Sequence, residues 1–439
     1  MLIMKKFILL GLALFSIISA VAQSARIYRT EFLTYDKRDD AEVDNRSQTA
    51  RYTDFKPERL AVEGEETYYA QKVELDGAMN DYNLFFHLEN VGSAYTVYVN
   101  GVAVAEVEDP FTAADFMLSP YMRQGENVLM LALRESLTPQ LQEGVTLPRF
   151  NIFENSYLFA QRRLAIHDFD MVLEPDSTRQ FAKLRLNVIV NNDFNFAETI
   201  QVGYDIYNPK GKLMEYSVNE IEVEGRSKDT LSFNPDIYHA YEFKWGEGKA
   251  APLYNVMLYI KRNGMLWEYI PLKVGFGKTE YRDGKFYRFD KELKLQMQKH
   301  FNAQPDKAQT KKAIEQLKLR GINTLCPDYP QPKWFYDMCD AAGMFVVDCA
   351  NINSPTNYEN RAVGGTPAND PALVEEYINR VKAMYYRSRN HSCIVAFSLG
   401  GQHSGNGYNM YKAYQWLKSM NPSLPVIYEG AEGEWNSDL

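Results

Sequence analysis

The sequence predicts two β-sandwich domains followed by a parallel α/β domain, and the order of its elements carries that prediction. Short strands separated by turns fill the chain to about Gln161, and a second set of shorter strands continues to Gly275. From Phe276 onward, helices and strands alternate. A chain of 439 residues is also too long for a single domain. We therefore expect a signal peptide and three domains, at residues 1–22, 23–161, 162–275 and 276–439.

The amino-terminal segment has the pattern of a secretory signal peptide. Lys5 and Lys6 precede an apolar run from Phe7 to about Ala20, and Ala20-Val21-Ala22 is a small-x-small cleavage site. The run is too short, and too soon followed by polar sequence, for a membrane-spanning helix. We expect cleavage after Ala22 and export of the mature protein to a periplasm or to the outside of the cell. The alternative is an uncleaved anchor helix.

Composition narrows the classes of partner. The net charge is −9 and the basic residues form no cluster, so a nucleic-acid partner is not expected. An aromatic content of 13% suits a carbohydrate ligand, because the C–H faces of sugars pack on aromatic rings, although most aromatic residues form cores.

The cysteines are all in the last third of the chain, within strand or helix patterns and without the spacing of a zinc site. They are Cys326, Cys339, Cys349 and Cys393. A disulfide framework would instead be spread over a small domain. We therefore expect buried free thiols, no metal site and no cofactor.

The first predicted domain consists of strands joined by short turns. Strand segments lie at 83–91 and 95–107, and Asn100-Gly101 inside the second segment is a two-residue hairpin turn. A further strand follows the turn at Gln124-Gly125. Regularly spaced short strands of this kind favour a sandwich or jelly roll.

The second predicted domain continues the β pattern. Apolar residues alternate with mostly polar ones through 182–192, which is typical of a half-buried strand. Asn208 begins a turn, and Asn263-Gly264 is the turn of a second hairpin. About seven strands fit the segment, which favours an immunoglobulin-like sandwich.

In the third predicted domain, segments with the hydrophobic pattern of a helix alternate with short apolar segments typical of buried strands. Helices are predicted at 307–321, 332–343, 370–391 and 411–423, and strands at 294–298, 322–326, 344–350, 393–397 and 425–430. Asp370 caps the third helix and Pro371 occupies its first position. This alternation predicts either a parallel barrel or a doubly wound sheet.

Several long segments resemble, in order, glycoside hydrolase family 2, the family of β-galactosidases, β-glucuronidases and β-mannosidases. The first domain carries "AYTVYVNG" and "DPFTAADFMLSPYMRQGENVL", and "VGFGKTEYRDGKF" precedes the barrel region. The last domain carries "YPQPKWFYDMCDAAGMFVVDCANIN", "RSRNHSCIVAFSLGG" and "NPSLPVIYEG". The resemblance covers essentially the whole mature chain.

This resemblance implies a sugar-binding jelly roll at 23–161, an immunoglobulin-like sandwich at 162–275 and a partial (β/α)8 TIM-type barrel at 276–439, with about five of eight strands. It also implies hydrolysis of terminal β-linked sugars by two carboxyl groups about 5 Å apart. A β-linked glycan is then the expected ligand. Two open parallel edges would require cover from the chain itself, a second copy or a partner chain.

The sequence departs from the family pattern where the chemistry should lie. The family's acid/base glutamate follows Ser-Leu-Gly in an Asn-Glu pair, and here that pair reads Gly401-Gln402; an amide has no proton to give. Pro355 stands where magnesium-dependent members carry a metal-ligating histidine. The family nucleophile lies on barrel strand seven, and the sequence stops at Leu439, so we expect this chain to lack it.

Polar residues at the ends of the predicted parallel strands form the candidate site. We expect six to contact a ligand: Asp348, Asn351, Gly401, Gln402, His403 and Glu429. None is assigned as catalytic. Gln402 is the substituted acid/base position, and His403 is the candidate substitute, since imidazole titrates near neutral pH. The alternatives are a loop histidine bonded to backbone and, for Asp348, a structural hydrogen-bond acceptor.

Three hypotheses of function follow. The first is an exported family relative that has lost its chemistry and retains carbohydrate binding or a scaffold role. The second is a working β-glycosidase, completed by another chain or by atypical residues such as His403. The third is a fragment with no independent function.

Overall fold

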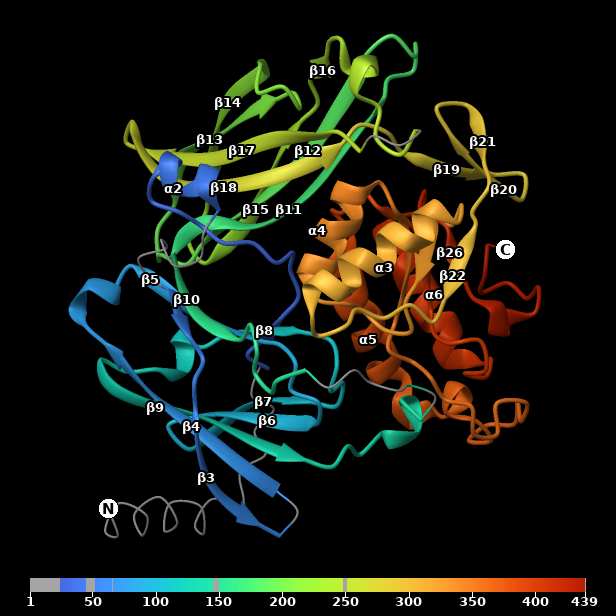
Figure 1. Ribbon diagram of the computed structural model, residues 1–439. Helices are drawn as coiled ribbons and strands as arrows, with labels where there is room; N and C mark the ends of the chain where they lie inside the picture. The colour runs from blue at the N-terminus through green and yellow to red at the C-terminus, as the bar shows by residue number, and fades with distance from the viewer. Residues whose placement is uncertain are drawn as a thin grey trace. The chain divides into compact units, whose positions relative to one another are not determined.

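The computed structural model describes residues 24–44, 52–64, 66–143, 145, 150–247 and 251–438 (Figure 1). The predicted signal peptide lies outside these residues. The chain forms two compact units. Unit 1 comprises the described residues up to Ile27, Thr53–Thr138 and Ile152–Gln161, and unit 2 comprises Tyr28–Tyr52, Pro139–Asn151 and Arg162–Leu439. Both the second and the third predicted domains therefore fall in unit 2, and their exact limits stay predictions.

Unit 1 is a β-sandwich, as predicted. Its two sheets have the strand orders β1-β8-β5-β10-β2 and β3-β4-β9-β6-β7. Alternate residues of β5 and β9, such as Phe86 and Leu131, enter one buried core from the two sheets. The strands are β1 (Arg26–Ile27), β2 (Tyr52–Asp54), β3 (Glu58–Glu63), β4 (Glu66–Leu75), β5 (Tyr82–Leu88), β6 (Ala94–Val99), β7 (Val102–Val107), β8 (Ala114–Met117), β9 (Gly125–Arg134) and β10 (Tyr157–Arg162).

The predicted hairpin turn between β6 and β7 is confirmed. Asn100 and Gly101 have φ angles of 52° and 84°, the left-handed values that a two-residue turn needs to match the twist of its strands. The Asn100 side-chain oxygen also accepts a hydrogen bond from the Val128 backbone N–H at 3.0 Å, which fixes the turn to β9.

Unit 2 begins with the second sandwich, whose two sheets have the orders β11-β12-β15, with β16 beside β12, and β14-β13-β17-β18. The predicted alternation in β12 is confirmed, because Leu184, Leu186, Val188 and Val190 are all buried in its core. Its strands are β11 (Leu164–Pro175), β12 (Ala182–Asn192), β13 (Glu198–Tyr207), β14 (Leu213–Val223), β15 (Ser227–Phe233), β16 (Asp236–Ile237), β17 (Leu253–Arg262) and β18 (Met265–Gly275).

A hairpin turn, a short helix and a small meander complete the second sandwich and its surroundings. Asn263 and Gly264, with φ angles of 52° and 76°, form the predicted turn between β17 and β18. The helix α2 (Arg38–Val43) is held by Arg38, whose guanidinium lies 2.7 Å from the Asp205 carboxylate. A meander follows β18: β19 (Thr279–Arg282), β20 (Lys285–Arg288) and β21 (Lys291–Leu293).

The predicted parallel strands of the last region are confirmed. They form a sheet in the order β22-β23-β24-β25-β26, and every neighbouring pair is parallel. The order follows the chain without reversal, whereas a doubly wound sheet reverses its strand order at a switch point. The arrangement is therefore that of a barrel segment. The strands are β22 (Met297–Lys299), β23 (Thr324–Cys326), β24 (Phe345–Cys349), β25 (Ile394–Ser398) and β26 (Val426–Ile427).

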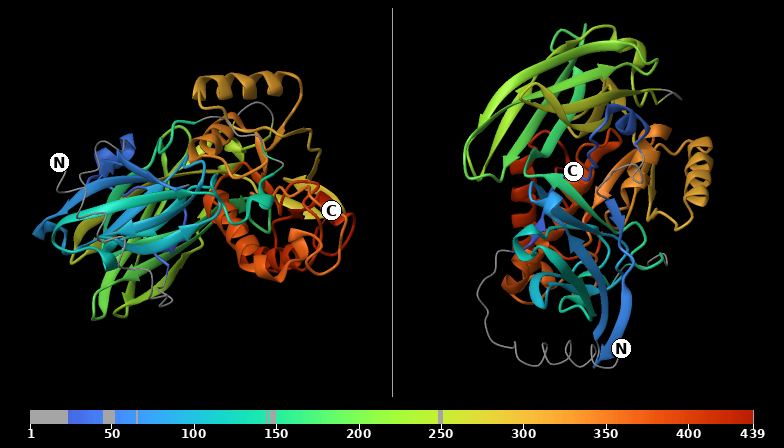
Figure 2. Two further views of the ribbon diagram at one scale, coloured as in Figure 1. Left: turned by 90° about the horizontal axis from the view of Figure 1, so that it is seen from below. Right: turned by 90° about the vertical axis from the view of Figure 1, so that its left-hand side faces the viewer.

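The helices of this region pack around the sheet (Figure 1) and are α3 (Lys307–Leu319), α4 (Lys333–Ala342), α5 (Val374–Ser388) and α6 (Tyr408–Met420). The outermost is α3, which lies at the surface in both views of Figure 2 and buries one face through Ile314 and Leu317. Asp370 accepts a hydrogen bond from the Ala372 N–H at 3.0 Å, so the predicted cap is confirmed. It caps a short 3-10 turn that leads into α5.

The remaining helical elements are short 3-10 turns: η2 (Gly77–Met79), η3 (Ser119–Tyr121), η4 (Pro139–Leu141), η5 (Ala240–Phe243), η6 (Pro367–Asn369), η7 (Pro371–Leu373) and η8 (Glu429–Ala431). All four cysteines are free, as predicted; three are buried and Cys326 is half-buried. Among the described residues, no helix is long and apolar enough to cross a membrane.

Candidate functional site

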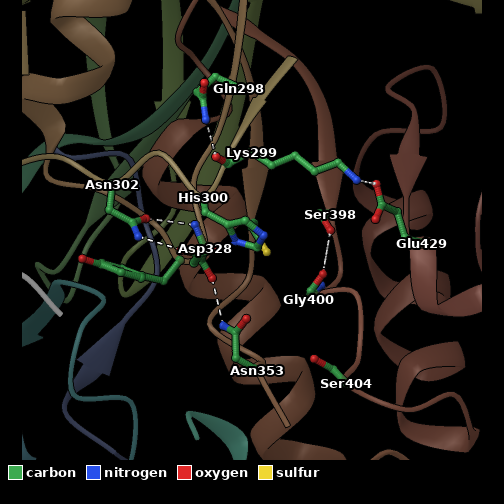
Figure 3. Close-up of polar contacts among 12 residues, drawn as sticks. Gln298, Lys299, His300, Asn302, Asp328, Asn353, Ser398, Gly400, Ser404 and Glu429 are labelled. Atoms are coloured by element: carbon green, nitrogen blue, oxygen red, sulfur yellow. Dashed lines mark hydrogen bonds and ion pairs between the residues drawn. The ribbon is translucent and has the colours of Figure 1, made fainter. Parts of the chain in front are cut away.

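The polar side chains that follow the parallel strands gather at one edge of the sheet, because the carboxyl ends of parallel strands lie together (Figure 3). Lys299 ends β22 and His300 follows it, Asp328 follows β23, and Ser398 ends β25. Glu429 follows β26. We call this set, together with Asn302, Asn353, Gln402 and His403, the strand-end cluster.

One half of the strand-end cluster is a hydrogen-bonded network built on Asp328. Its two carboxylate oxygens lie 2.6 Å from His300 Nδ1 and 2.7 Å from Asn302 Nδ2 (Figure 3). Asn353 Nδ2 donates to the Asp328 main-chain oxygen at 2.9 Å. The carboxylate orients the imidazole, whose side chain is 77% exposed. The network therefore presents a positioned imidazole ring to solvent, whereas Asn302 is half-buried and Asn353 is buried.

The other half is an ion pair that connects the two outer strands of the sheet. Lys299 Nζ contacts the Glu429 carboxylate, which joins the end of β22 to the end of β26 (Figure 3). Both side chains remain accessible, at 50% and 41% exposure. An ion pair this exposed contributes little to stability, so its charges remain available to a ligand.

The loop after β25 is packed tightly against the loop after β24. Ser404 Oγ donates to the Ile352 carbonyl at 2.9 Å, and the Gly401 N–H donates to the same oxygen at 2.8 Å. A Cβ at Gly400 would lie 2.6 Å from that carbonyl oxygen, and a Cβ at Gly401 would overlap Asn353 Oδ1. Glycine is therefore required here by the close approach of the two loops.

Gln402 and His403 lie on the outer side of this loop, and both are exposed. The His403 ring lies 5.0 Å from the Tyr358 ring, centroid to centroid. A Cβ added at Gly430 would lie 2.9 Å from the main-chain carbonyl oxygen of Gln402. Gln402 is therefore next to the segment that carries Glu429. The structure thus brings Gly401, Gln402, His403 and Glu429 to one region, and their contact with a ligand stays a prediction.

Asp348 does not join them, which contradicts the ligand-binding role predicted for it. Its side chain is fully buried and accepts hydrogen bonds from Tyr336 Oη on α4 at 2.9 Å and from Ser388 Oγ on α5 at 2.6 Å. The carboxylate therefore faces the helices rather than the strand-end cluster. Burial raises its pKa to about 6. This placement agrees with the alternative, a structural hydrogen-bond acceptor.

The ligand contact predicted for Asn351 is also wrong, because the structure buries this residue completely. Its main-chain oxygen accepts a hydrogen bond from Arg380 Nη1 at 2.6 Å. Arg380 is itself buried and pairs with Glu376 at 2.7 Å. The loop after β24 is thereby fixed from behind, and Asn351 serves the fold instead of facing a ligand.

Sequence reasoning missed Lys299, His300 and Asn302. Lys299 ends β22, a three-residue strand whose residues are exposed or half-buried, and His300 and Asn302 follow it. All three lie just beyond the strand expected at 294–298. Polar residues at the carboxyl ends of the other parallel strands were taken as site candidates. Treating the end of the first strand in the same way would have found these three residues. Cys326, at the end of β23, is no nucleophile at neutral pH, because burial raises the pKa of its thiol to about 12.

One group of potential metal ligands lies at the opposite, amino-terminal side of β25. Asp337, Asp340 and His391 have ligand atoms within 4.8 Å of one another. His391 Nδ1 is 2.7 Å from Asp340, whose other oxygen accepts the Cys393 N–H at 2.7 Å. Asp337 pairs with Lys333 at 2.8 Å. These contacts describe a hydrogen-bonded junction between α4 and β25.

Two family models match the chain. The model for the sugar binding domain of glycosyl hydrolases family 2 matches residues 48–159, and the model for the TIM barrel domain of the same family matches residues 298–438. The second range contains the entire strand-end cluster.

Curated relatives are similar over most of the chain. A beta-galactosidase of Vibrio cholerae is 29% identical over 78% of this chain and 34% of its own length. A beta-galactosidase of Streptococcus thermophilus is 24% identical over 82% of this chain and 35% of its own length. The chain spans about a third of the length of these relatives.

Solved structures share the fold. A Bacteroides uniformis beta-glucuronidase aligns with 82% of this chain and 46% of its own, at a TM-score of 0.68 and 16% identity. A putative beta-galactosidase from Bacteroides fragilis aligns with 95% of this chain and 65% of its own, at a TM-score of 0.67 and 14% identity. Sequence segments, fold and both family models agree, and the chain belongs to glycoside hydrolase family 2.

Proposed function

We propose that this chain is a β-galactosidase-like family member that binds β-linked sugars at the strand-end cluster and hydrolyses them weakly or not at all. The observation that carries the proposal is the loop after β25. Gln402 occupies the family's acid/base position, at the carboxyl end of its strand and exposed. An amide cannot donate a proton, and general acid–base assistance accounts for about 10²–10⁴-fold of rate.

The neighbouring strand does not compensate. Asp348, the carboxylate on β24, faces α4 and α5, where Tyr336 and Ser388 occupy its oxygens. The Glu429 carboxylate is paired with Lys299. A proton donor for a leaving group would thus have to come from the His300–Asp328 network or from His403.

Binding is supported by the polar groups that remain exposed. Lys299 and His300 can donate hydrogen bonds to sugar hydroxyls, Glu429 can accept them, and Gln402 can do both. The galactoside class follows from the curated relatives, which are beta-galactosidases, and from the match to the sugar binding domain.

A paired assay of hydrolysis and binding tests the proposal. We expect calorimetric titration with methyl β-galactoside to show binding, and aryl β-galactosides, β-glucuronides and β-mannosides to show turnover at least about 10²-fold below that of a competent relative. Gln402→Ala should weaken binding. Gln415→Ala, an exposed glutamine on α6, is the matched control and should not.

The active-enzyme alternative gives a different result. Turnover by the wild-type protein that disappears in His403→Ala would identify this histidine as the substitute acid and overturn the proposal of impaired catalysis. Loss of turnover in His300→Ala would do the same for the Asp328 network. A protein that neither binds nor turns over these sugars would overturn the carbohydrate-binding proposal itself.

We also propose that the mature protein is exported. Support comes from Lys5 and Lys6, the apolar run that follows them, and the Ala20-Val21-Ala22 site. Amino-terminal sequencing of the protein recovered outside the cytoplasm should begin at Gln23. Retention of Met1 in the exported form would contradict cleavage.

A further inference from the structure

The second sandwich carries a pocket that belongs to no element of the strand-end cluster. It lies between the loop that follows β11 and the segment that follows β16, and its volume is about 460 Å³. Ligand pockets in proteins commonly enclose about 300–1,000 Å³. The lining residues are Gln180, Phe181, Tyr238, His239, Tyr241 and Glu242.

An aromatic pair forms one wall of the pocket. The rings of Phe181 and Tyr238 meet edge to face, with centroids 4.7 Å apart. Tyr238 is nevertheless 56% exposed, whereas Tyr204 and Tyr254 in the same sandwich are fully buried. Phe181 thus supports a tyrosine ring at the surface, and such a ring can receive the C–H face of a sugar.

The rim of the pocket is polar, and no lysine or arginine is among the lining residues. Gln180, His239 and Glu242 are exposed, and His239 Nδ1 lies 3.7 Å from a Glu242 oxygen. Arg179, next along the chain, is directed to Asp290 at 2.8 Å. An amide, an imidazole and a carboxylate can bind hydroxyl groups. The Glu242 carboxylate lies beside His239, and Lys244, 5.3 Å from the centre of the Tyr241 ring, pairs with Glu247 at 3.1 Å. Because each basic group here has a carboxylate next to it, the chemistry favours a neutral ligand over a phosphate or sulfate.

The loop that carries Gln180 and Phe181 is already held in place. The Asp176 carboxylate accepts hydrogen bonds from the backbone N–H groups of Thr178 at 2.8 Å, Gln180 at 2.9 Å and Phe181 at 2.8 Å. Because the loop is ordered before a ligand arrives, binding need not supply that ordering free energy.

We propose that this pocket is a second carbohydrate-binding site, which takes one or two pyranose units of a neutral glycan. Tyr238 stacks on the sugar ring, and Gln180, His239 and Glu242 bind its hydroxyl groups. The site is separate from the strand-end cluster, so it would hold a polysaccharide whether or not that cluster binds or cleaves a terminal sugar.

Affinity electrophoresis through gels that contain soluble β-1,4-galactan tests the proposal. Wild-type protein should be retarded, and Tyr238→Ala should raise the apparent Kd by about tenfold, the factor expected for one aromatic contact. Tyr216→Ala, a 64% exposed tyrosine on β14, is the matched control and should migrate like wild type. Gln180→Ala gives an independent loss from the polar rim.

The possible results separate this site from the strand-end cluster. Retardation that is lost in Tyr238→Ala and kept in Gln402→Ala supports the second site, even if the strand-end cluster binds nothing. Retardation that is lost only in Gln402→Ala assigns the glycan to the strand-end cluster and overturns the second site. Wild-type protein that galactan does not retard also overturns it. Unchanged melting temperatures of the variants show that they are folded.

Discussion

The two ends of β25 are built on opposite principles. Before the strand, charged residues are buried and paired: Arg389 contacts Asp168 at 2.6 Å, and the two side chains are only 8% and 3% exposed. After the strand, Gln402 and His403 are exposed, and the nearby ion pair of Lys299 and Glu429 is close to half exposed.

The polar residues before β25 connect parts of unit 2 that lie far apart in the sequence. Asn390 Nδ2 donates to Thr30 Oγ1 at 2.8 Å, and Asn390 Oδ1 accepts the Met171 N–H at 2.9 Å. Arg387 pairs with Glu31. In barrels the amino-terminal face supports stability and the carboxyl-terminal face carries function. The comparison teaches that similar residue types have different roles at the two ends of one strand.

Breaking the buried pair should have the largest effect. Arg389→Met removes the partner of a buried carboxylate, and we expect unit 2 to lose about 3–5 kcal/mol of unfolding free energy. Urea denaturation followed by tryptophan fluorescence measures it, since all five tryptophans belong to unit 2: Trp245, Trp267, Trp334, Trp416 and Trp435.

The matched control is Arg361→Met. Arg361 pairs with Glu434, and their side chains are 48% and 40% exposed, so its loss should change the free energy by less than about 1 kcal/mol. Equal effects of the two arginine substitutions would show that burial of the charge pair is not what distinguishes the two ends of β25.

The second prediction concerns Asp348, which sequence reasoning placed with the ligand site and the structure places in the interior. Its pKa is raised to about 6 in the folded protein, against about 4 in an unfolded chain. Its stabilising contribution is therefore fully present below pH 4 and is lost as pH rises through 6, a change of about 2–3 kcal/mol.

Comparison with Asp348→Asn isolates this contribution, because an amide does not titrate. We expect the difference in unfolding free energy between the two proteins to vary between pH 4 and 7, measured from urea midpoints by tryptophan fluorescence. A difference that is constant over this range would mean that Asp348 titrates normally, as a solvent-exposed residue of the strand-end cluster would.

The reasons for success and failure of the sequence analysis are local. The Asn100-Gly101 and Asn263-Gly264 turns were predictable because two-residue hairpins demand positive φ angles that few residues accept. The alternation in β12 revealed its buried face, since the other face is polar. In β24 all five residues are buried, so alternation gave no sign that Asp348 faces the helices.

The first parallel strand is the opposite case to β24, because none of its residues is buried. β22 reads Met-Gln-Lys, with no buried residue, and its place in the sheet depends on pairing with β23. The strand expected at 294–298 overlaps β22 at Met297 and Gln298, but a strand with no buried residue does not show which side chains at its end face the site, and Lys299 and His300 were not predicted. Likewise, the loop after β25 could be recognised from its motif, but its close packing on Ile352 is a tertiary contact.

The third prediction tests that packing. Gly400→Ala places a methyl group 2.6 Å from the Ile352 carbonyl oxygen, a backbone atom that cannot rotate away. We expect a loss of about 1–3 kcal/mol from overpacking. Urea midpoints measure the loss, and Gly77→Ala, where nothing lies within 4 Å of the added Cβ, should leave the melting temperature of the protein unchanged. A stable Gly400→Ala protein would show that the loop after β25 can shift freely.

The smallest expected effect on stability comes from the carboxyl end of the sheet. Lys299→Gln removes the ion pair with Glu429, whose side chain is 41% exposed, and solvent can replace the lost contact. The unfolding free energy should change by less than about 1 kcal/mol. The affinity for methyl β-galactoside, measured by calorimetric titration, should fall because Lys299 is one of the exposed donors. A loss of stability as large as that in Arg389→Met, with affinity unchanged, would make the ion pair a structural link and end the contrast between the two ends of the sheet.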